Sequence, residues 1–276
     1  MKLSIITINY NNLEGLRLTM QSVLEQQCRQ FEYIVIDGAS TDGSAEFVRS
    51  HATNLSYWVS EPDGGIYSAM NKGVRAATGD YVLMLNSGDF LVDNQVIERI
   101  LPELDGTDIV QGNIVEQRAD GLWRNRGYGR SNITFFDVMK CHFLHQAAFC
   151  RRSLFSQYGE FDESFRIIGD SVFFVKCLGF GNASFRYVDI DVANYDMHGV
   201  SAATSGPTHD VYLADVDRYN QLFPQRLRQQ LADDDKKIRL YDQLHSNRFI
   251  WLLVVGITHL SNLFYKTRKC TEKIKC

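Results

Sequence analysis

The first ninety residues alternate between short apolar runs and segments whose apolar residues recur with a helical period. The apolar runs at 3–8, 33–36, 55–59 and 81–85 have the length of strands buried in a sheet. In the segments between them, apolar residues three or four positions apart predict helices. This alternation predicts right-handed βαβ units and therefore an α/β fold with a doubly wound, mostly parallel sheet.

The pattern is less regular in the second half of the chain. The segments expected there are strands over 108–116, 146–150 and 187–192 and one helix over 170–178. Mixed structure after a doubly wound half suggests one fused domain over 1–208, with its halves at 1–107 and 108–208.

From residue 209 the chain becomes helical and charged, and it is then sharply apolar over 249–265. A helix that spans a membrane needs about 20 apolar residues, and this run is shorter. Basic residues follow it, which favours an anionic bilayer surface. We therefore predict a C-terminal helical extension over 209–276 with peripheral membrane contact through 249–275. Packing on the main domain or on a dimer partner is the open alternative.

Composition excludes some classes of function. The formal net charge is −4, so the chain lacks the basic surplus of a general nucleic-acid-binding protein, and no nucleic-acid partner is expected. The six cysteines have no metal-ligand spacing, which predicts free thiols. The N-terminal apolar run is too short for a secretory signal, so we expect a cytoplasmic protein, including the inner face of the cell membrane.

Polar segments follow each of the four expected strands of the first half. They lie at 7–12, 37–43, 61–65 and 86–89, and three of them carry carboxylates. Ligands of open α/β sheets bind beyond the carboxyl ends of the strands. The site is therefore predicted at this edge. A dinucleotide oxidoreductase is excluded because no GxGxxG follows the first strand.

The stretches SIITINYNN, VIDGASTDGS and SEPDGGIYSAMNKGVRAATGDYVLMLNSGDF resemble, in order and spacing, the donor half of glycosyltransferase family 2. The resemblance implies a GT-A fold in which 1–107 binds a nucleotide-sugar and 108–208 faces the acceptor. The implied reaction transfers a sugar from the nucleotide-diphosphate donor to a hydroxyl of a glycan or lipid-linked acceptor. It implies a single displacement with inversion, in a setting such as bacterial surface-polysaccharide assembly.

Residues after the first two strands are candidates for donor binding. A carboxylate such as Asp37 can accept hydrogen bonds from a ring N–H or a ribose hydroxyl, and the matching family residue contacts the base or ribose. Thr7 and Asn9 would line the same pocket. The alternative is that Asp37, like Asp42, caps the turn and the next helix; capping is the favoured role of Asp42.

Two loops with glycines are expected to approach the donor. Asp63 and Gly64 precede a helix whose N-terminus favours anions, although Asp63 could simply be its N-cap. Ser87 and Gly88 follow the fourth strand and are expected at the same donor.

The family keeps its metal-binding acidic motif at 86–89. Asn86 and Gly88 stand where acids are usual, which leaves Asp89 as the only carboxylate. Because Mn²⁺ or Mg²⁺ can be held by one or two carboxylates with substrate phosphates, we predict a divalent cation bound by Asp89, with a capping role as the alternative. His198 lies where related enzymes place a late histidine, and imidazole is an acceptable Mn²⁺ ligand.

Asp170 begins an apolar helix and resembles the family's catalytic base, which takes the proton of the acceptor hydroxyl. A plain N-cap role for Asp170, or catalysis by Asp162 or Glu163, is the alternative. His145 and Gln146 resemble the acceptor-side motif. Competing functions are a nucleotidyltransferase and a non-catalytic module that binds nucleotide-sugars or glycans.

Overall fold

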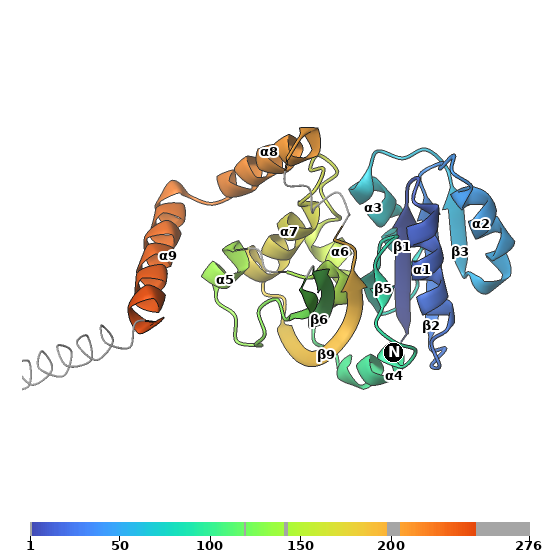
Figure 1. The fold of residues 1–276 in the computed structure, drawn as a ribbon, viewed down its shortest axis with the longest axis horizontal. Coiled ribbons are helices and arrows are strands. Elements are labelled where there is room, and N and C mark those ends of the chain that lie inside the picture. Colours follow the sequence, from blue (N-terminus) through green and yellow to red (C-terminus); the bar gives the residue numbers. More distant parts are fainter. Residues whose placement is uncertain (1, 119, 141–142, 198–204, 247–276) are drawn as a thin grey trace, which may run out of the picture. The chain divides into compact units, whose positions relative to one another are not determined.

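The computed structural model describes residues 2–118, 120–140, 143–197 and 205–246. Its strands form one sheet in the order β3-β2-β1-β4-β8-β6-β9-β5, with β7 paired to β6 (Figure 1). The four strands of the first half are parallel: β1 (Leu3–Asn9), β2 (Phe31–Asp37), β3 (Tyr57–Ser60) and β4 (Tyr81–Met84). Their register places Asn9 beside Asp37 and Asp37 beside Ser60, so these strands end side by side.

Helices cover both faces of this parallel part. They are α1 (Leu13–Leu24), α2 (Ser44–Ser50) and α3 (Ile66–Ala76). Alternate residues of β1 and β2, such as Leu3 and Tyr33, share a core with α1 and α2. On the other face α3 approaches closely, because a Cβ at Gly73 would lie 2.3 Å from a methyl carbon of Ile6. The doubly wound prediction is confirmed.

Beyond β4 the chain extends the same sheet with strands of both directions. They are β5 (Phe90–Leu91), β6 (Ile109–Arg118), β7 (Gly121–Asn125), β8 (Ala148–Arg151) and β9 (Phe185–Tyr195). β6 lies between β8, which is antiparallel to it, and β9, which is parallel. The strand expected over 146–150 begins only at Ala148, because η3 (His145–Ala147) forms a 3₁₀ turn before it.

Short helices lie in the same part of the chain: α4 (Val96–Ile100), η2 (Leu101–Glu103), α5 (Phe135–Met139), α6 (Ser153–Tyr158) and α7 (Gly169–Phe174). The helix expected over 170–178 begins as α7 and continues as a π-helical segment, η4 (Val175–Phe180). Helix α7 packs against α6 through aromatic side chains: Phe173 of α7 stacks on Phe155 of α6 with ring centroids 4.4 Å apart. One further 3₁₀ turn, η1 (Ala52–Asn54), precedes β3.

The chain divides into two compact units, 1–219 and 220–276. The boundary falls within the last turn of helix α8 (Pro207–Gln221), and α9 (Gln225–Ser246) belongs to the second unit. Through residue 246, no described helix is both long enough and apolar enough to cross a membrane. The apolar segment 249–265 lies outside the described residues, as does the whole membrane-contact prediction built on it.

Candidate active site

The carboxylate of Asp37 is enclosed at the end of β2 and carries four hydrogen bonds. Asn9 Nδ2 donates to it at 2.8 Å, the Ser40 hydroxyl and N–H at 2.6 and 3.0 Å, and the Ser60 hydroxyl at 2.6 Å. Burial alone would raise the pKa of Asp37, but the donors from Ser40, Ser60 and Asn9 outweigh it and lower the pKa. Asp37 therefore ties together the ends of three strands. Its contact with a nucleotide stays a prediction.

The two candidates at the end of β1 are also buried. The Thr7 hydroxyl lies 3.0 Å from the Tyr33 hydroxyl, and Thr7 is fully enclosed. Asn9 donates to Ser40 as well as to Asp37, at 3.2 Å, while its Oδ1 has no hydrogen-bond partner in the described part of the chain. Both side chains brace the strand end from within the protein.

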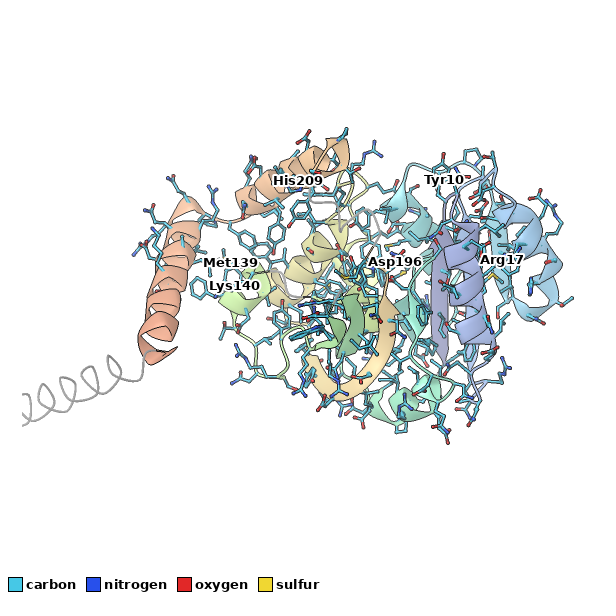
Figure 2. The ribbon with its side chains drawn as sticks, viewed as in Figure 1. Tyr10, Arg17, Met139, Lys140, Asp196 and His209 are labelled. Atoms are coloured by element: carbon cyan, nitrogen blue, oxygen red, sulfur yellow. The ribbon has the colours of Figure 1, made fainter. Side chains whose placement is uncertain are left out.

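A ring and a carboxylate that flank Gly38 lie nearer the surface. A Cβ at Gly38 would lie 2.9 Å from Asp63 Oδ2 and 3.2 Å from Tyr10 Cδ2, so a side chain there would push one of these exposed groups aside. The Tyr10 side chain is 69% exposed (Figure 2). Asp63 Oδ1 accepts from the N–H of Gly65, which is itself the N-cap of α3, so Asp63 closes a turn and is not the N-cap. Sequence reasoning missed Tyr10, although an exposed ring directly after the first strand was the available signal.

A cation from the second half reaches the loop that precedes α3. The Arg166 guanidinium donates to the carbonyl of Gly64 at 2.9 Å, and Arg166 is otherwise exposed. Asp42, by contrast, accepts from Leu13 N–H at 2.8 Å and Ser44 N–H at 3.1 Å, which confirms its capping role. The loop 61–65, which is predicted to bind the donor, is therefore linked to the segment that leads to Asp170.

The loop after β4 makes room for an acid from elsewhere in the chain. Gly88 has φ of +105°, and a Cβ there would lie 2.6 Å from Asp196 Oδ2. Asp196 follows β9 (Figure 2), so a carboxylate from the far end of the domain occupies the place that an acid at position 88 would take. The Gly88 N–H donates to Thr19, and the Ser87 carbonyl accepts from Asn12 at 3.2 Å. Sequence reasoning missed Asp196.

Asp89 is buried beside Asp196, and its contacts only partly offset the cost of burying its charge. Its Oδ1 accepts from the Asp196 N–H at 2.9 Å, and the N-cap of the next helix, α4, is Gln95, so Asp89 does not cap that helix. Burial raises the pKa of Asp89 to about 7; the Asp196 N–H, the charge of His145 and a Gln146 hydrogen bond only partly oppose this, and the charge of Asp196 adds to the rise.

The residues around Asp89 suit a divalent cation. Asn86, in the same loop as Asp89, has a buried Oδ1 without a partner among the described residues, which makes it a further candidate oxygen ligand beside the carboxylates of Asp89 and Asp196. Oxygen ligands of this kind are what Mg²⁺ and Mn²⁺ prefer. The described ranges contain no cluster of three or more His, Cys, Asp or Glu that could hold a metal alone. The predicted ligand His198 lies outside them.

Asp170 and His145 form a partly buried pair next to this loop. His145 Nδ1 lies 3.0 Å from Asp170 Oδ2, and His145 Nε2 lies 3.3 Å from Asn86 Nδ2. Burial opposes the charge of both groups, yet their hydrogen bond and mutual attraction lower the pKa of Asp170 and raise that of His145. Because the N-cap of α7 is Ile168, the N-cap role for Asp170 is wrong.

The rival acids are engaged in local structure. Asp162 Oδ1 accepts from the Ser164 hydroxyl at 2.6 Å and its N–H at 3.1 Å, as expected of a turn. Glu163 Oε1 accepts from Asn71 at 3.0 Å. Gln146 is buried next to His145 and hydrogen-bonds Asp89.

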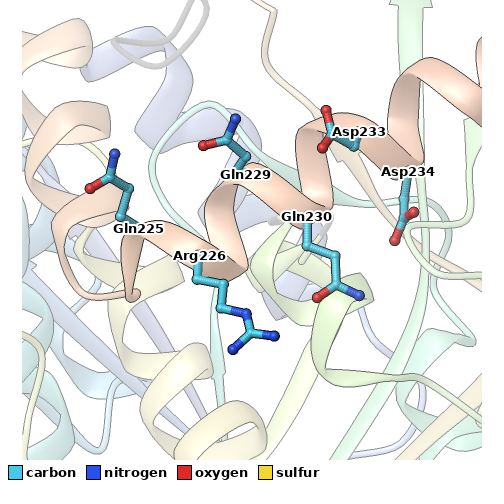
Figure 3. A pocket seen from close by; sticks show the side chains of 6 residues that line it. All are labelled: Gln225, Arg226, Gln229, Gln230, Asp233 and Asp234. Atoms are coloured by element: carbon cyan, nitrogen blue, oxygen red, sulfur yellow. The ribbon is translucent and has the colours of Figure 1, made fainter.

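Two hollows are lined by other residues. One, of about 550 Å³, runs along α9 and is lined by its polar side chains (Figure 3). The other, of about 420 Å³, is lined by charged residues that include Arg124, which pairs with Asp191 at 2.6 Å. Neither contains a predicted site residue.

Residues 4–159 match the family described as Glycosyl transferase family 2. An uncharacterized glycosyltransferase of Mycobacterium tuberculosis is 36% identical over 180 residues, which cover 63% of this chain and 67% of that protein. A PGL/p-HBAD biosynthesis glycosyltransferase of Mycobacterium bovis is 30% identical over 202 residues, which cover 71% of this chain and 77% of that protein.

Solved structures are similar in fold. TarS of S. aureus in complex with UDP-GlcNAc has a TM-score of 0.61 at 19% identity and covers 76% of this chain and 64% of its own. A mannosyltransferase from Pyrobaculum calidifontis in complex with GDP-Man and Mn²⁺ has a TM-score of 0.55 at 19% identity, with coverage of 78% and 68%. The fold is therefore that of GT-A glycosyltransferases. The chain belongs to glycosyltransferase family 2 and is an enzyme of that family.

Proposed function

We propose that this glycosyltransferase transfers a sugar from a nucleoside-diphosphate sugar to a hydroxyl of a glycan or lipid-linked acceptor, with inversion. The observation that carries the proposal is the contact between two groups of residues: the Asp170–His145 pair touches Asn86, which stands in the loop of Asp89. An ionised carboxylate thus lies next to acids suited to a cation. TarS and the mannosyltransferase, which share the fold, were solved with such donors.

The donor base would bind at the ends of β1 and β2. The exposed Tyr10 ring offers a flat surface for a base, and stacking of this kind contributes about 1–3 kcal/mol per base. Asp63 beside it can accept from a ring N–H or a ribose hydroxyl. Asp37 would act mainly by fixing the loop beneath, together with Asn9. Arg166 supplies a positive charge at Gly64 for the phosphates.

Asp89 and Asp196 would hold a divalent cation, with Asn86 as a further oxygen donor. The ion would neutralise the charge that develops on the departing nucleoside diphosphate. A cation would also offset the cost of an ionised Asp89, whose burial opposes its charge.

Asp170 would accept the proton of the acceptor hydroxyl. As that proton moves to the carboxylate, the acceptor oxygen bonds to the anomeric carbon, and the bond from that carbon to the diphosphate oxygen breaks on the opposite face. The lowered pKa of Asp170 keeps it ionised near neutral pH, as a base must be. The family membership sets aside a nucleotidyltransferase and a non-catalytic module.

The test is a donor panel of UDP-, GDP- and dTDP-sugars with purified protein, Mn²⁺ or EDTA, and the variants Asp170→Asn and Asp162→Asn. We expect metal-dependent release of one nucleoside diphosphate. Asp170→Asn should lower kcat by about 10²–10⁴-fold without weakening nucleotide binding, because it removes the proton acceptor. Asp162→Asn is the matched control and should leave kcat unchanged. Unaltered turnover in Asp170→Asn would overturn the assignment.

A role in surface-polysaccharide or other glycan assembly is part of the proposal. It is supported by the Mycobacterium bovis relative, which is named for PGL/p-HBAD biosynthesis. Once the donor is known, proton NMR of the product, which reads the configuration at the anomeric carbon, tests inversion.

A further inference from the structure

A buried tyrosine from the first turn of α3 reaches the start of α7. Tyr67 is 3% exposed, and its hydroxyl lies 2.5 Å from the carbonyl oxygen of Ile167 and 3.1 Å from Asp170 Oδ1. A phenol has one proton, so these two acceptors share it in a three-centre hydrogen bond. Tyr67 thus contacts both the carboxylate of Asp170 and the backbone just before it.

The position of the Tyr67 ring is fixed by a glycine. A Cβ at Gly169 would lie 2.7 Å from Tyr67 Cε2, so any side chain there would displace the ring. On another side the ring packs against Phe161, with centroids 5.8 Å apart. The ring therefore packs directly against the backbone of α7 at Gly169.

The backbone before Asp170 is held from another direction as well. Asp215 of α8 is buried, and its Oδ2 accepts from the N–H groups of Arg166 and Ile167 at 2.8 and 2.7 Å. Asp215 does not touch Asp170. Among the described residues, two side chains hydrogen-bond the Asp170 carboxylate: Tyr67 at Oδ1 and His145 at Oδ2.

We propose that Tyr67 is a positioning residue, which together with His145 fixes the Asp170 carboxylate in the orientation that receives the proton of the acceptor hydroxyl. This inference rests on the proposed role of Asp170 as the base. Since α3 begins directly after the loop 61–65, the same contact also joins the helix behind the donor loop to the acceptor side.

The test compares Tyr67→Phe with Tyr81→Phe. Tyr81 of β4 is also buried and also donates to a backbone carbonyl, that of Thr107 at 2.6 Å, but it has no part in the site. Tyr67→Phe should lower kcat by up to about 100-fold, because small misplacements of a reacting group are costly. The KM for the donor should stay unchanged. Tyr81→Phe also removes a buried hydrogen bond but should keep kcat.

A second readout needs no turnover. The Asp170 carboxyl ¹³C signal, assigned with Asp170→Asn, is titrated by NMR in wild type and in both variants. The titratable groups around Asp170 are Tyr67 from α3, His145 from η3 and, beyond His145, Asp89. Tyr67→Phe removes a donor to the ionised form, so the midpoint should rise by about one unit, given that two or three such bonds lower a carboxylate pKa by about two.

Gly169→Ala is a second variant, which keeps Tyr67 but displaces its ring, and it should raise the same midpoint. An Asp170 midpoint in Tyr67→Phe that equals the midpoint in Tyr81→Phe overturns the inference. Normal turnover in Asp170→Asn would instead overturn the proposed base, whichever way the midpoint moves. The two failures are thus distinguishable.

Discussion

Two carboxylates at the carboxyl edge of the sheet are both buried, yet their surroundings differ. Asp37, at the end of β2, accepts four hydrogen bonds from Asn9, Ser40 and Ser60, and its pKa is lowered. Asp89, after β4, lies beside a second acid, and its pKa is raised to about 7. Burial opposes the charge of both, so the number and charge of the partners decide the difference.

The comparison separates an acid whose charge the protein itself satisfies from one whose charge it satisfies poorly. Asp37 accepts four hydrogen bonds from the protein, and its contact with a nucleotide stays a prediction. The charge of Asp89 is less well satisfied by the protein, because a second acid, Asp196, lies beside it. In the same loop, Asn86 Oδ1 has no partner among the described residues. A bound cation would stabilise that arrangement most. Four variants can break or sharpen this distinction.

The largest effect is expected from Asp37→Ala. It leaves donors of Asn9, Ser40 and Ser60 unpaired in the interior and should lower the free energy of unfolding by about 3–5 kcal/mol at neutral pH. Because the folded pKa is lowered, this contribution is present above the usual Asp pKa of about 4 and is lost as pH falls through the folded value. Urea denaturation at several pH values measures it. Asp42→Ala, which removes only an exposed cap, should cost about 1 kcal/mol.

Asp89→Asn should raise, and not lower, the free energy of unfolding of the metal-free protein at neutral pH. A raised folded pKa means that wild type loses stability as pH rises from about 4 to about 7, at about 1.4 kcal/mol per unit of pKa difference. The variant should therefore be more stable than wild type above pH 7, by up to a few kcal/mol, and equal to it below pH 4. Thermal unfolding in EDTA at pH 4 and pH 8 checks this. A destabilised variant at pH 8 would contradict the assigned environment.

Asp196→Asn should weaken Mn²⁺ binding in the presence of nucleoside diphosphate by about 10-fold or more, because one of two carboxylates near the ion is lost. Isothermal calorimetry with Mn²⁺ measures the affinity. The matched control is Asp191→Asn, an acid of β9 that pairs with Arg124 and should not alter it. Equal affinities in the two variants would remove Asp196 from the proposed site.

A further loss of nucleotide affinity is expected from Tyr10→Ala. Loss of the exposed ring should weaken nucleotide binding by about 1–3 kcal/mol, the range for stacking on one base, without loss of stability. Equilibrium binding of the nucleoside diphosphate measures it. Tyr57→Ala, at another exposed tyrosine that lies in β3, is the control, and an equal loss there would refute the stacking role.

Much of the donor half could be predicted from sequence because its signals are local. The run at 33–36 is apolar throughout, and Asn12 caps α1 by accepting from Gly15 N–H at 3.1 Å, as its sequence position suggests. Beyond β4, the pattern of a few neighbouring residues does not predict where the strands lie. β5 has only two residues, and β7 is a solvent-exposed hairpin strand without a clear apolar period.

The candidate site was predictable where one residue carries the signal, as with Asp170 after Gly169. It was not predictable where an acid expected in one segment comes instead from another part of the chain. From sequence alone, Gly88 indicates that an acid is missing from the loop, but the fold places the Asp196 carboxylate against Gly88. In the same way, nothing local connects Tyr67 with a carboxylate 103 positions later.

The most direct test of the account is the position of a bound metal. Crystals grown with Mn²⁺ and the nucleoside diphosphate that the donor panel selects would locate the ion by its anomalous scattering. We predict one strong peak in contact with Asp89 and Asp196, bridged to the diphosphate, with the base on Tyr10. A nucleotide bound elsewhere, or Mn²⁺ with no contact to either carboxylate, would contradict it.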